Sequence, residues 1–460
     1  MTRIAPGVQP KRPAAAPPSP EVLHSIRADM ERRGLNVLDR RMPSVTMALI
    51  VEPVDVPGLN EGIFYYEAAL PQRVAAFVSP SRAVRGRPTT GRLTCLVLLV
   101  DFADNPGIRP PADIGNMLFS TKAYATGSLR DFYSENSYGQ LDVDGQVTDW
   151  MRLPQPYAYY VDGNNGQGAY PHNSQRMVED ALVVAASQLN FQNFDTDGDG
   201  YIDGLFIVHA GGGAEADPNP TSRAQKMWSH QWNLPQPFTA NGITAYSYSV
   251  QPEDGRIGVF CHEFGHILGL PDLYDTTNKS EGVGVWCLMG AGSWNNAGLT
   301  PAQLCIWAKA RLNWTQPQNV AGSTRVSLNP IETDPAGTAR VWSKGAFGSE
   351  YFLIENRQRH GFDMHLPGDG LLIWHINDLQ NNNNHPGSYR VGLCQADGRT
   401  DLEFARNQGD PDDAFPGGIG NTRFDDISNP AARDAVGNRT GITISQIAVN
   451  GGIVTCDISV

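Results

Sequence analysis

The sequence lacks the features of a membrane protein, a nucleic-acid-binding protein or a small disulfide-rich protein. Its longest strongly apolar run is Leu96–Val100 with its immediate neighbours, far below the roughly 18 residues that a membrane-crossing helix needs. Lys and Arg number 35 against 48 Asp and Glu, and the formal net charge of -13 has the wrong sign for covering phosphates. The 6 cysteines are widely scattered and form no CxxC pair. We therefore expect no membrane span and no nucleic-acid partner, while disulfide pairing stays open.

The N-terminal residues lack the apolar stretch of about 7 residues that a secretory signal peptide requires. Export by another route and a cytoplasmic location are therefore both open. Residues 1 to about 18 are rich in Pro, Ala and Arg, and we expect a disordered arm because proline removes a donor and blocks helix formation. Ser19 then predicts the N-cap of a helix with Pro20 at its first position, and Gly34 predicts its end.

The remaining sequence predicts a mixed α+β protein. A length of 460 residues favours about two domains plus an extra segment, and 48 Gly with 33 Pro disfavour a helical bundle. Two apolar stretches, 93–102 and 204–210, predict buried strands. Helices are predicted after Ser128, after Ser174 and from 301 to 312 after Thr300; four strand-like stretches follow, EYFLIENR, GLLIWHIN, GITISQIAV and GIVTCDISV.

The chemistry concentrates in the segment GVFCHEFGHILGLPDLYD, residues 258–275. His262 and His266 are four residues apart, so on a helix both imidazoles project from one face and can share a metal ion. Glu263 lies beside them, and in such a motif the glutamate accepts a proton from the water that zinc activates. Cys261 precedes His262 directly, but adjacent side chains diverge on a helix, so we assign it to packing or a disulfide. The motif predicts a zinc site with Glu263 as general base.

The third zinc ligand is predicted at Asp272. Gly269 can adopt the left-handed conformation that ends a helix, and Pro271 prevents its resumption, so the chain must turn. Asp272 lies ten residues after His262, the spacing of the third ligand in the metzincin pattern HExxHxxGxxH. Glu281 and Asp275 remain as weaker alternatives.

Met289, in CLMGAGSW, has the position of a metzincin Met-turn, in which a methionine packs beneath the ligand histidines. A plain core methionine is the other interpretation of this residue. Some metzincins carry a tyrosine two residues after this methionine, but Ala291 occupies that place.

Several separated motifs, in order, resemble the immune inhibitor A-like secreted bacterial metalloproteases, over about residues 92–378. They are LVLLVDFADNP, LRDFYSENSYGQLDV, DTDGDGYIDGLFIVHAG, GVFCHEFGHILGLPDLYD, CLMGAGSW, EYFLIENRQ and LPGDGLLIWHIN. The resemblance implies a zinc-dependent endopeptidase, with His262, His266 and Asp272 at the ligand positions and Glu263 at the position of the base. It also implies an extracellular location.

A second oxygen-rich motif, FDTDGDGYIDG, suggests a structural calcium ion. Its carboxylates are Asp195, Asp197, Asp199 and Asp203. Such a density of like charge is unfavourable without a cation. An EF-hand is excluded because Phe206 stands where the bidentate glutamate would be. For the acidic stretch 409–428 we expect a solvated loop, and for His209 and His230 ordinary core or rim positions.

These observations predict three parts: residues 1–91 as an N-terminal arm and pro-segment, 92–315 as a metzincin-like catalytic domain, and 316–460 as a β-rich C-terminal domain. The predicted function is a zinc metalloendopeptidase that hydrolyses internal bonds of protein or peptide substrates. The first alternative is a protease-derived binding or adhesion protein without turnover. The second is a metal-dependent amidase. The Arg- and Gly-rich residues 84–92 predict an exposed linker at which the pro-segment is removed.

Overall fold

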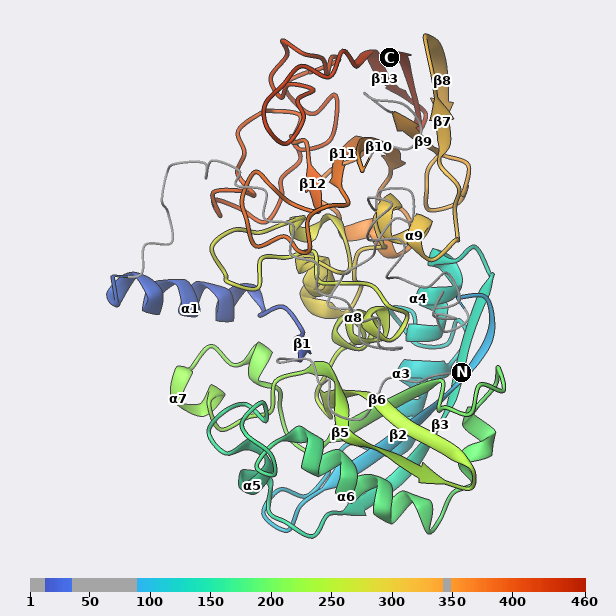
Figure 1. Ribbon diagram of the computed structural model, residues 1–460, viewed down its shortest axis with the longest axis vertical. Coiled ribbons are helices and arrows are strands. Elements are labelled where there is room, and N and C mark those ends of the chain that lie inside the picture. Colours follow the sequence, from blue (N-terminus) through green and yellow to red (C-terminus); the bar gives the residue numbers. More distant parts are fainter. Residues whose placement is uncertain (1–12, 35–88, 342–348) are drawn as a thin grey trace, which may run out of the picture.

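The computed structural model describes residues 13–34, 89–341 and 349–460. Of the predicted linker, residues 84–88 lie outside the described residues, whereas Gly91 and Arg92 begin the strand Gly91–Asp101. The chain forms an elongated molecule with a six-stranded sheet in its lower half, the C-terminal strands in its upper half and helix α8 between them (Figure 1). The strands of the large sheet are, in spatial order, β1 (Ala14–Ala15), β5 (His230–Ala240), β6 (Ile243–Pro252), β4 (Gly204–His209), β2 (Gly91–Asp101) and β3 (Leu141–Arg152).

Strand β2 is an interior strand of this sheet, and both of its faces are apolar. β3 and β4 pair with it in parallel, and the strand is buried as its near-continuous apolar run predicts. Side chains on one face, such as Val97 and Leu99, belong to the core that includes Phe264 of α8 (Ile257–Ile267). Side chains on the other face, such as Leu98, belong to a second core with α6 (Ser174–Ala186). The alternation of β2 therefore places α8 against one face of the sheet and α6 against the other.

The edge of this sheet contradicts the expectation of a disordered arm up to residue 18. From residue 13 on the chain is part of the fold: Ala14 and Ala15 pair antiparallel with Gln231 and His230 of β5. The amide of Ala16 continues the ladder by donating to the carbonyl of Ser229 at 2.9 Å. Proline did not prevent this pairing because the donors that the ladder uses lie on the alanines. Helix α1 (Pro20–Arg32) follows, with the predicted Ser19 cap.

The remaining helices surround α8 and the large sheet. They are α3 (Pro111–Phe119), α4 (Leu129–Asn136), α5 (Tyr157–Val161), α7 (Pro220–Arg223) and α9 (Ile306–Arg311). The predicted Ser128 cap of α4 is confirmed, with a reciprocal bond from Asp131. Two other predicted starts are wrong.

Asn173, not Ser174, caps α6, because the Ser174 hydroxyl contacts Nε2 of His230 at 2.8 Å. Helix α9 begins at Ile306 rather than 301, because the amides of Gln303 and Leu304 donate to side chains of Asp363 and Asn136.

The C-terminal strands form two further sheets. The five-stranded sheet runs β12 (Val391–Leu393), β11 (Gly370–Asn377), β10 (Glu350–Arg357), β9 (Thr338–Val341) and β7 (Gln318–Val320); the three-stranded sheet runs β13 (Thr443–Asn450), β14 (Ile453–Ser459) and β8 (Thr324–Leu328). One face of the larger sheet packs on the smaller sheet in a core of its own. Its other face contributes Leu353 and Trp374 to the same core as Phe264.

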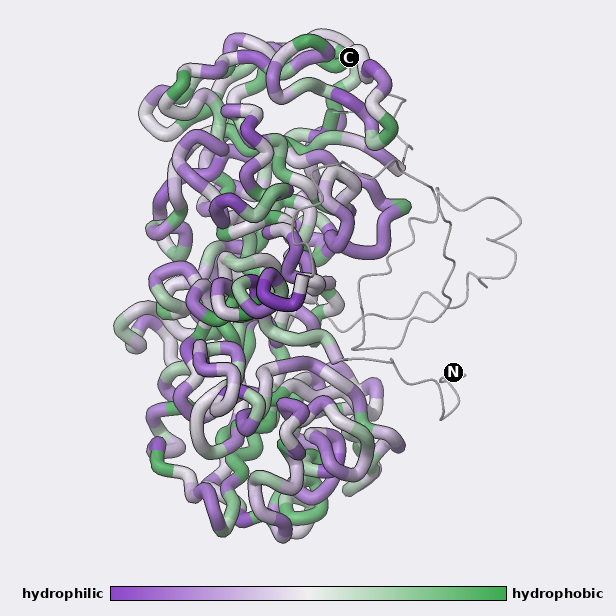
Figure 2. The backbone as a smooth tube through the Cα atoms, turned by 90° about the vertical axis from the view of Figure 1, so that its left-hand side faces the viewer, coloured by the Kyte–Doolittle hydropathy of each residue, from purple (hydrophilic) through white to green (hydrophobic). Residues whose placement is uncertain are grey.

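Hydrophobic residues accordingly occur in both halves and at the level between them (Figure 2). The mixed helices and sheets confirm the predicted α+β class, while the boundary at residue 316 stays a prediction.

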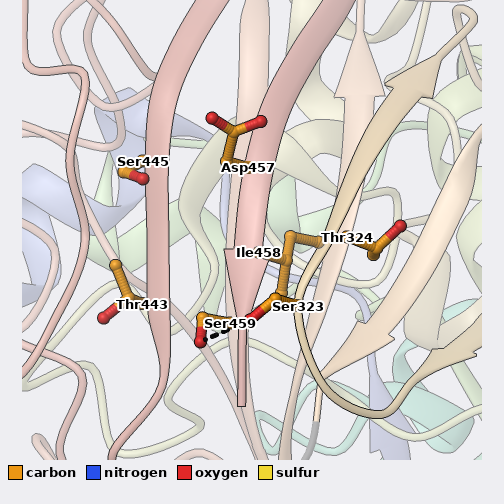
Figure 3. A pocket seen from close by; sticks show the side chains of 7 residues that line it. All are labelled: Ser323, Thr324, Thr443, Ser445, Asp457, Ile458 and Ser459. Carbon is orange, nitrogen blue, oxygen red and sulfur yellow. Dashed lines mark hydrogen bonds between the residues drawn. The ribbon is translucent and has the colours of Figure 1, made fainter.

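Among the described residues, no helix is both long and apolar enough to cross a membrane. All six cysteines lie in the described ranges, and none is in a disulfide. A pocket of about 390 Å³ opens on the small C-terminal sheet, where Ser459, Ser323 and Asp457 line it (Figure 3). It shares no residue with the segment 258–275, so the chemistry has to be sought at α8.

Candidate metal centre

Helix α8 brings the two motif histidines to one buried face. All eleven residues of the helix are buried, and His262 and His266 are 0% and 1% exposed. The helix ends as predicted: Leu268 is its C-cap, and Gly269 takes a left-handed φ of 95°. The turn is closed by the amide of Leu270, which donates to the carbonyl of Gly265 at 2.9 Å. This reversal returns the chain towards the histidine face of α8.

Asp272 lies at the point where the chain returns. Its Oδ1 atom is 3.1 Å from Nε2 of His262 and 3.2 Å from Nε2 of His266. The two Nε2 atoms are 3.2 Å apart. Ligands bound tetrahedrally to zinc at 2.0–2.1 Å are spaced by about 3.3 Å, so the three atoms already have the separation that one shared zinc ion requires.

Both imidazoles are held in the tautomer that a metal needs. Nδ1 of His262 lies 3.0 Å from the carbonyl of Leu288, and Nδ1 of His266 lies 2.8 Å from the carbonyl of Leu270. A carbonyl can only accept, so each Nδ1 carries the proton and each Nε2 presents a lone pair. Two lone pairs and a carboxylate oxygen at this spacing repel one another unless a cation lies between them. The donor set therefore fits a metal ion.

The charge states of the ligands agree with this assignment. Burial lowers the pKa of His262, which keeps the imidazole neutral. Burial alone would raise the pKa of Asp272, but the two imidazoles outweigh it and hold that pKa below its usual value. Neutral imidazoles with one carboxylate are a common ligand set of catalytic zinc.

Glu263, next to His262 on α8, has no partner for either carboxylate oxygen among the described residues. The residue is fully buried. Burial, followed by the charges of Asp272 and Glu215, raises the pKa of Glu263 well above its usual range. Two orphaned oxygens on a buried carboxyl group are costly in an ordinary core. They fit a site where a metal, water or substrate completes the bonding.

Met289 lies directly beneath the ligand helix. A Cβ atom added at Gly265 would come within 2.6 Å of the Met289 sulfur, so the thioether fills the space that this glycine leaves. The carbonyl of Met289 accepts from the amide of Leu273 at 2.8 Å. Since Leu288 holds His262, this turn supports both one histidine and the segment that carries Asp272.

The rival ligands lie away from the cluster. Asp275 accepts from the hydroxyls and amides of Thr277 and Ser280. Glu281 pairs with Arg27 of α1 and accepts from Gln408. The predicted grouping thus includes Asp272 and leaves out both alternatives.

Two residues near the cluster were not singled out from the sequence. The ring centroid of Tyr274 is 6.2 Å from that of His262, and its hydroxyl donates to the carbonyl of Ala15. Glu215 is buried, accepts from Ser229 and raises the pKa of Glu263. Tyr274 follows Asp272 by two residues, a proximity that could have pointed to it. Glu215 gives no sequence signal because it comes from a distant loop.

The N-terminal segment runs over this site. Besides Tyr274, two tryptophan indoles hold it: Trp228 donates to the carbonyl of Ala16 and Trp294 to that of Pro17, each at 2.8 Å. The amide of Ser19 donates to the carbonyl of Glu215. A pocket of about 420 Å³ lies here, and its wall includes Ser19, Glu215 and Val259 of α8.

The second predicted metal motif, the Asp195 loop, brings three of its four predicted carboxylates together. Carboxylate oxygens of Asp195, Asp197 and Asp203 lie within 4.8 Å of one another. Asp199 is not in this group; its Oδ1 accepts from the amide of Tyr201 at 2.8 Å. His230 has partners at both ring nitrogens, as expected for a core histidine.

Comparisons with known proteins agree with the motif. Residues 111–320 match the family model described as immune inhibitor A peptidase M6, catalytic domain. Immune inhibitor A of Bacillus thuringiensis subsp. alesti is 35% identical over 259 residues, which cover 45% of this chain and 37% of that protein. Pre-pro-metalloprotease PrtV of Vibrio cholerae serotype O1 is 32% identical over 294 residues, which cover 52% of this chain and 32% of that protein. The chain thus spans about a third of the length of these relatives.

Proposed function

Because residues 111–320 belong to the catalytic domain of the immune inhibitor A peptidase M6 family, we propose that this chain is a zinc-dependent metalloendopeptidase of metzincin type. The observation that carries the proposal is the convergence of three donor atoms, from His262, His266 and Asp272, at separations of 3.1 to 3.2 Å. The substrates are proteins or peptides cleaved at internal bonds. In keeping with the resemblance, we place the enzyme outside the cell.

Each residue of the cluster has a separate task. The Nε2 atoms of His262 and His266 and the carboxylate of Asp272 hold the zinc ion, and the carbonyls of Leu288 and Leu270 fix the two imidazoles. Zinc, when bound, polarises the scissile carbonyl and lowers the pKa of a water molecule to about 7. Glu263 accepts the proton of that water and later donates it to the leaving amine. Its unpartnered oxygens are suited to this exchange because no internal bond has to be broken first.

We also propose that residues 1–91 are a pro-segment that keeps the enzyme latent. Ala14–Ala16 add to the edge of β5 as an extended peptide would, and Tyr274, close to His262, binds the carbonyl of Ala15. Helix α1 is fastened next to them through Arg27, which pairs with Glu281. A substrate strand and this segment would compete for the same edge. The relative PrtV is itself named a pre-pro-metalloprotease.

For the predicted calcium ion we propose Asp195, Asp197 and Asp203 as ligands, with Asp199 as a supporting residue of the turn. The amides of Asp199 and Gly200 donate to Asp195 at 3.0 Å each, which orients one carboxylate of the group. Calcium accepts this kind of all-oxygen, flexible ligand set. We propose a structural role because the loop joins α6 to β4 and none of its carboxylates belongs to the cluster on α8.

The test of the proposed function combines metal content with cleavage of an unfolded protein such as casein. We expect one tightly held zinc ion per chain and internal cleavage once the N-terminal segment has been cut off after the linker at 84–92. A chelator should stop cleavage, and zinc should restore it. A binding or adhesion protein would hold zinc without cleaving, and an amidase would leave internal bonds of a peptide library intact. Either result would replace the proposal.

A separate experiment tests whether the N-terminal segment keeps the enzyme latent. Cutting after the linker should raise kcat/KM on a short peptide without lowering the melting temperature of the rest. Loss of solubility, or no gain in kcat/KM, would mean that the segment is a permanent part of the catalytic domain.

A further inference from the structure

The loop 395–413, between the last strand of the five-stranded sheet and the small sheet, gathers more negative charge than it neutralises. Carboxylate oxygens of Asp397, Asp401 and Asp410 lie within 4.8 Å of one another. Asp412 and Asp413 follow in the same turn, which the amide of Asp412 closes by donating to Asp410 at 2.8 Å.

Two guanidinium groups face these five carboxylates. Arg399 pairs with Asp397 and lies 3.0 Å from Asp410, 3.4 Å from Asp401 and 3.8 Å from Asp412. Arg406 lies 3.0 Å from Asp401. Five carboxylates and two guanidiniums leave a formal charge of three negatives. Both arginine side chains are more than half exposed, at 52% and 57%, so water weakens their attraction to the carboxylates. Charge of one sign at this density is unfavourable without a further cation.

Asp413 is a second and independent sign of a ligand. Its side chain is 1% exposed, which contradicts the expectation of a solvated loop at this residue. Oδ2 accepts from the Trp286 indole and from the amide of Asp410, each at 2.9 Å. Oδ1 has no hydrogen-bond partner among the described residues.

Asp413 also lies within the field of the cluster. The amide of Asp410 donates to Oδ2 of Asp413 at 2.9 Å, so the buried carboxyl group adjoins the cluster. A buried carboxylate with one bare oxygen beside surplus negative charge is the environment that a bound cation completes.

We propose that Asp397, Asp401 and Asp410, backed by Asp413, bind one calcium ion. Calcium suits this site because it takes six to eight oxygen ligands in flexible geometry, whereas zinc prefers nitrogen and sulfur donors. Magnesium demands a nearly ideal octahedron, which a loop of carboxylates at unequal depth does not offer. The site is separate from the Asp195 loop and from the cluster on α8.

The position of the loop assigns the ion a role. The amide of Val285 donates to the carbonyl of Gln408 at 2.8 Å, and the amide of Glu281 donates to the carbonyl of Leu402 at 2.9 Å. With the bonds from Trp286 to Asp413 and from Gln408 to Glu281, four hydrogen bonds join the loop to the segment that leads into Met289. A calcium ion in the loop therefore braces the turn beneath the zinc ligands from outside.

Terbium luminescence and calcium calorimetry on the full chain test this site. Terbium replaces calcium and is excited through a nearby indole, and Trp286 is hydrogen-bonded to Asp413. We expect Asp401→Asn with Asp410→Asn to abolish tryptophan-sensitised emission, to remove one calcium ion per chain and to reduce the calcium-induced rise in melting temperature. In a chelator this variant should melt no lower than the parent, because like charges have been removed. Magnesium at equal concentration should not restore the lost rise.

Three controls fix the location. Asp457→Asn, a 45% exposed acid on β14, should keep both emission and stoichiometry. Trp286→Phe should lose emission but keep the calcium ion. A variant with Asp195→Asn, Asp197→Asn and Asp199→Asn together should lose the calcium ion of the Asp195 loop and keep the emission that Trp286 sensitises. A folded Asp401→Asn, Asp410→Asn variant with unchanged calcium stoichiometry would overturn the proposal. If that variant does not fold, unchanged emission in Trp286→Phe would overturn it equally.

Discussion

The cluster on α8 and the acidic loop 395–413 hold their metal-binding atoms in opposite ways. On α8 the histidines are 0% and 1% exposed, and carbonyls of Leu288 and Leu270 fix both rings. In the loop the cluster is built of carboxylates, and its arginine partners are more than half exposed. Under the two proposals, the first site is built before its metal binds, whereas the second depends on its metal to reach a balanced charge. Loss of zinc should therefore remove activity with little loss of structure, and loss of calcium should loosen structure first.

The largest expected effect comes from removing one ligand of the prebuilt site. Asp272→Ala should weaken zinc affinity by about 100-fold or more, because a direct ligand matters at least as much as the residues that orient it. Asp275→Ala is the matched control, since Asp275 binds only its own turn. A competition titration against a zinc chelator measures both. Equal zinc affinity in the two variants would make the choice of Asp272 wrong.

Acid should destabilise the half that contains β5 and α8. Burial lowers the pKa of His230 to about 4, and that of His209 likewise to about 4. A pKa depressed in the folded state gives stability that is complete above the unfolded pKa of about 6.5 and is lost as the pH falls towards 4. We expect roughly 3 kcal/mol of unfolding free energy from each group over that window. Denaturant unfolding across this pH window should show a shallower pH slope for His230→Gln than for the parent, and an equal slope would contradict the assignment.

The packing beneath the zinc ligands can be tested by adding one carbon. Gly265→Ala places a Cβ within 2.6 Å of the Met289 sulfur. Met289 is 0% exposed, so its side chain has no free space into which it can move. We expect a loss of about 1–3 kcal/mol in unfolding free energy from this overpacking. Met289→Ala should relieve it, so the double variant should be more stable than the sum of the single losses predicts. Additive losses of unfolding free energy would show that the Cβ added at Gly265 and the Met289 side chain are not in steric conflict.

These positions also show what sequence patterns could and could not predict. The grouping of His262, His266 and Asp272 was predictable because its spacing is local: the histidines are four residues apart on a helix, and Gly269 turns the chain back to Asp272. The strand β2 was predictable from its apolar run alone. The burial of Asp413 was not, because it depends on Trp286, which is 127 residues away.

Errors at element ends have the same origin. The start of α9 is displaced because the side chains of Asp363 and Asn136 bind the amides of Gln303 and Leu304 from distant parts of the chain. The strand β1 could not be predicted from its own composition, since its partner β5 lies more than 200 residues further on. Local patterns thus predict the three candidate ligands better than the distant contacts that set where β1 and α9 begin.

The smallest expected effect concerns the Asp195 loop. Asp195→Asn, Asp197→Asn and Asp199→Asn together should remove part of the rise in melting temperature that calcium produces. A ligand that binds only the folded state stabilises it by RT ln(1 + [L]/Kd), and each kcal/mol is worth about 2–4 °C in a domain of this size. Differential scanning calorimetry with and without calcium measures the rise. An unchanged rise in the triple variant would show that this loop does not bind the stabilising calcium ion.

The most direct test of the zinc-peptidase account is Glu263→Gln in the chain cut after the linker. The substitution removes the proton acceptor and keeps the size of the side chain, and it leaves His262, His266 and Asp272 in place. We predict one zinc ion per chain, as in the parent, together with a fall of about 10²–10⁴-fold or more in kcat/KM for cleavage of an internal peptide bond. A zinc-loaded variant that cleaves at the rate of the parent would contradict the role of Glu263 and the mechanism built on it.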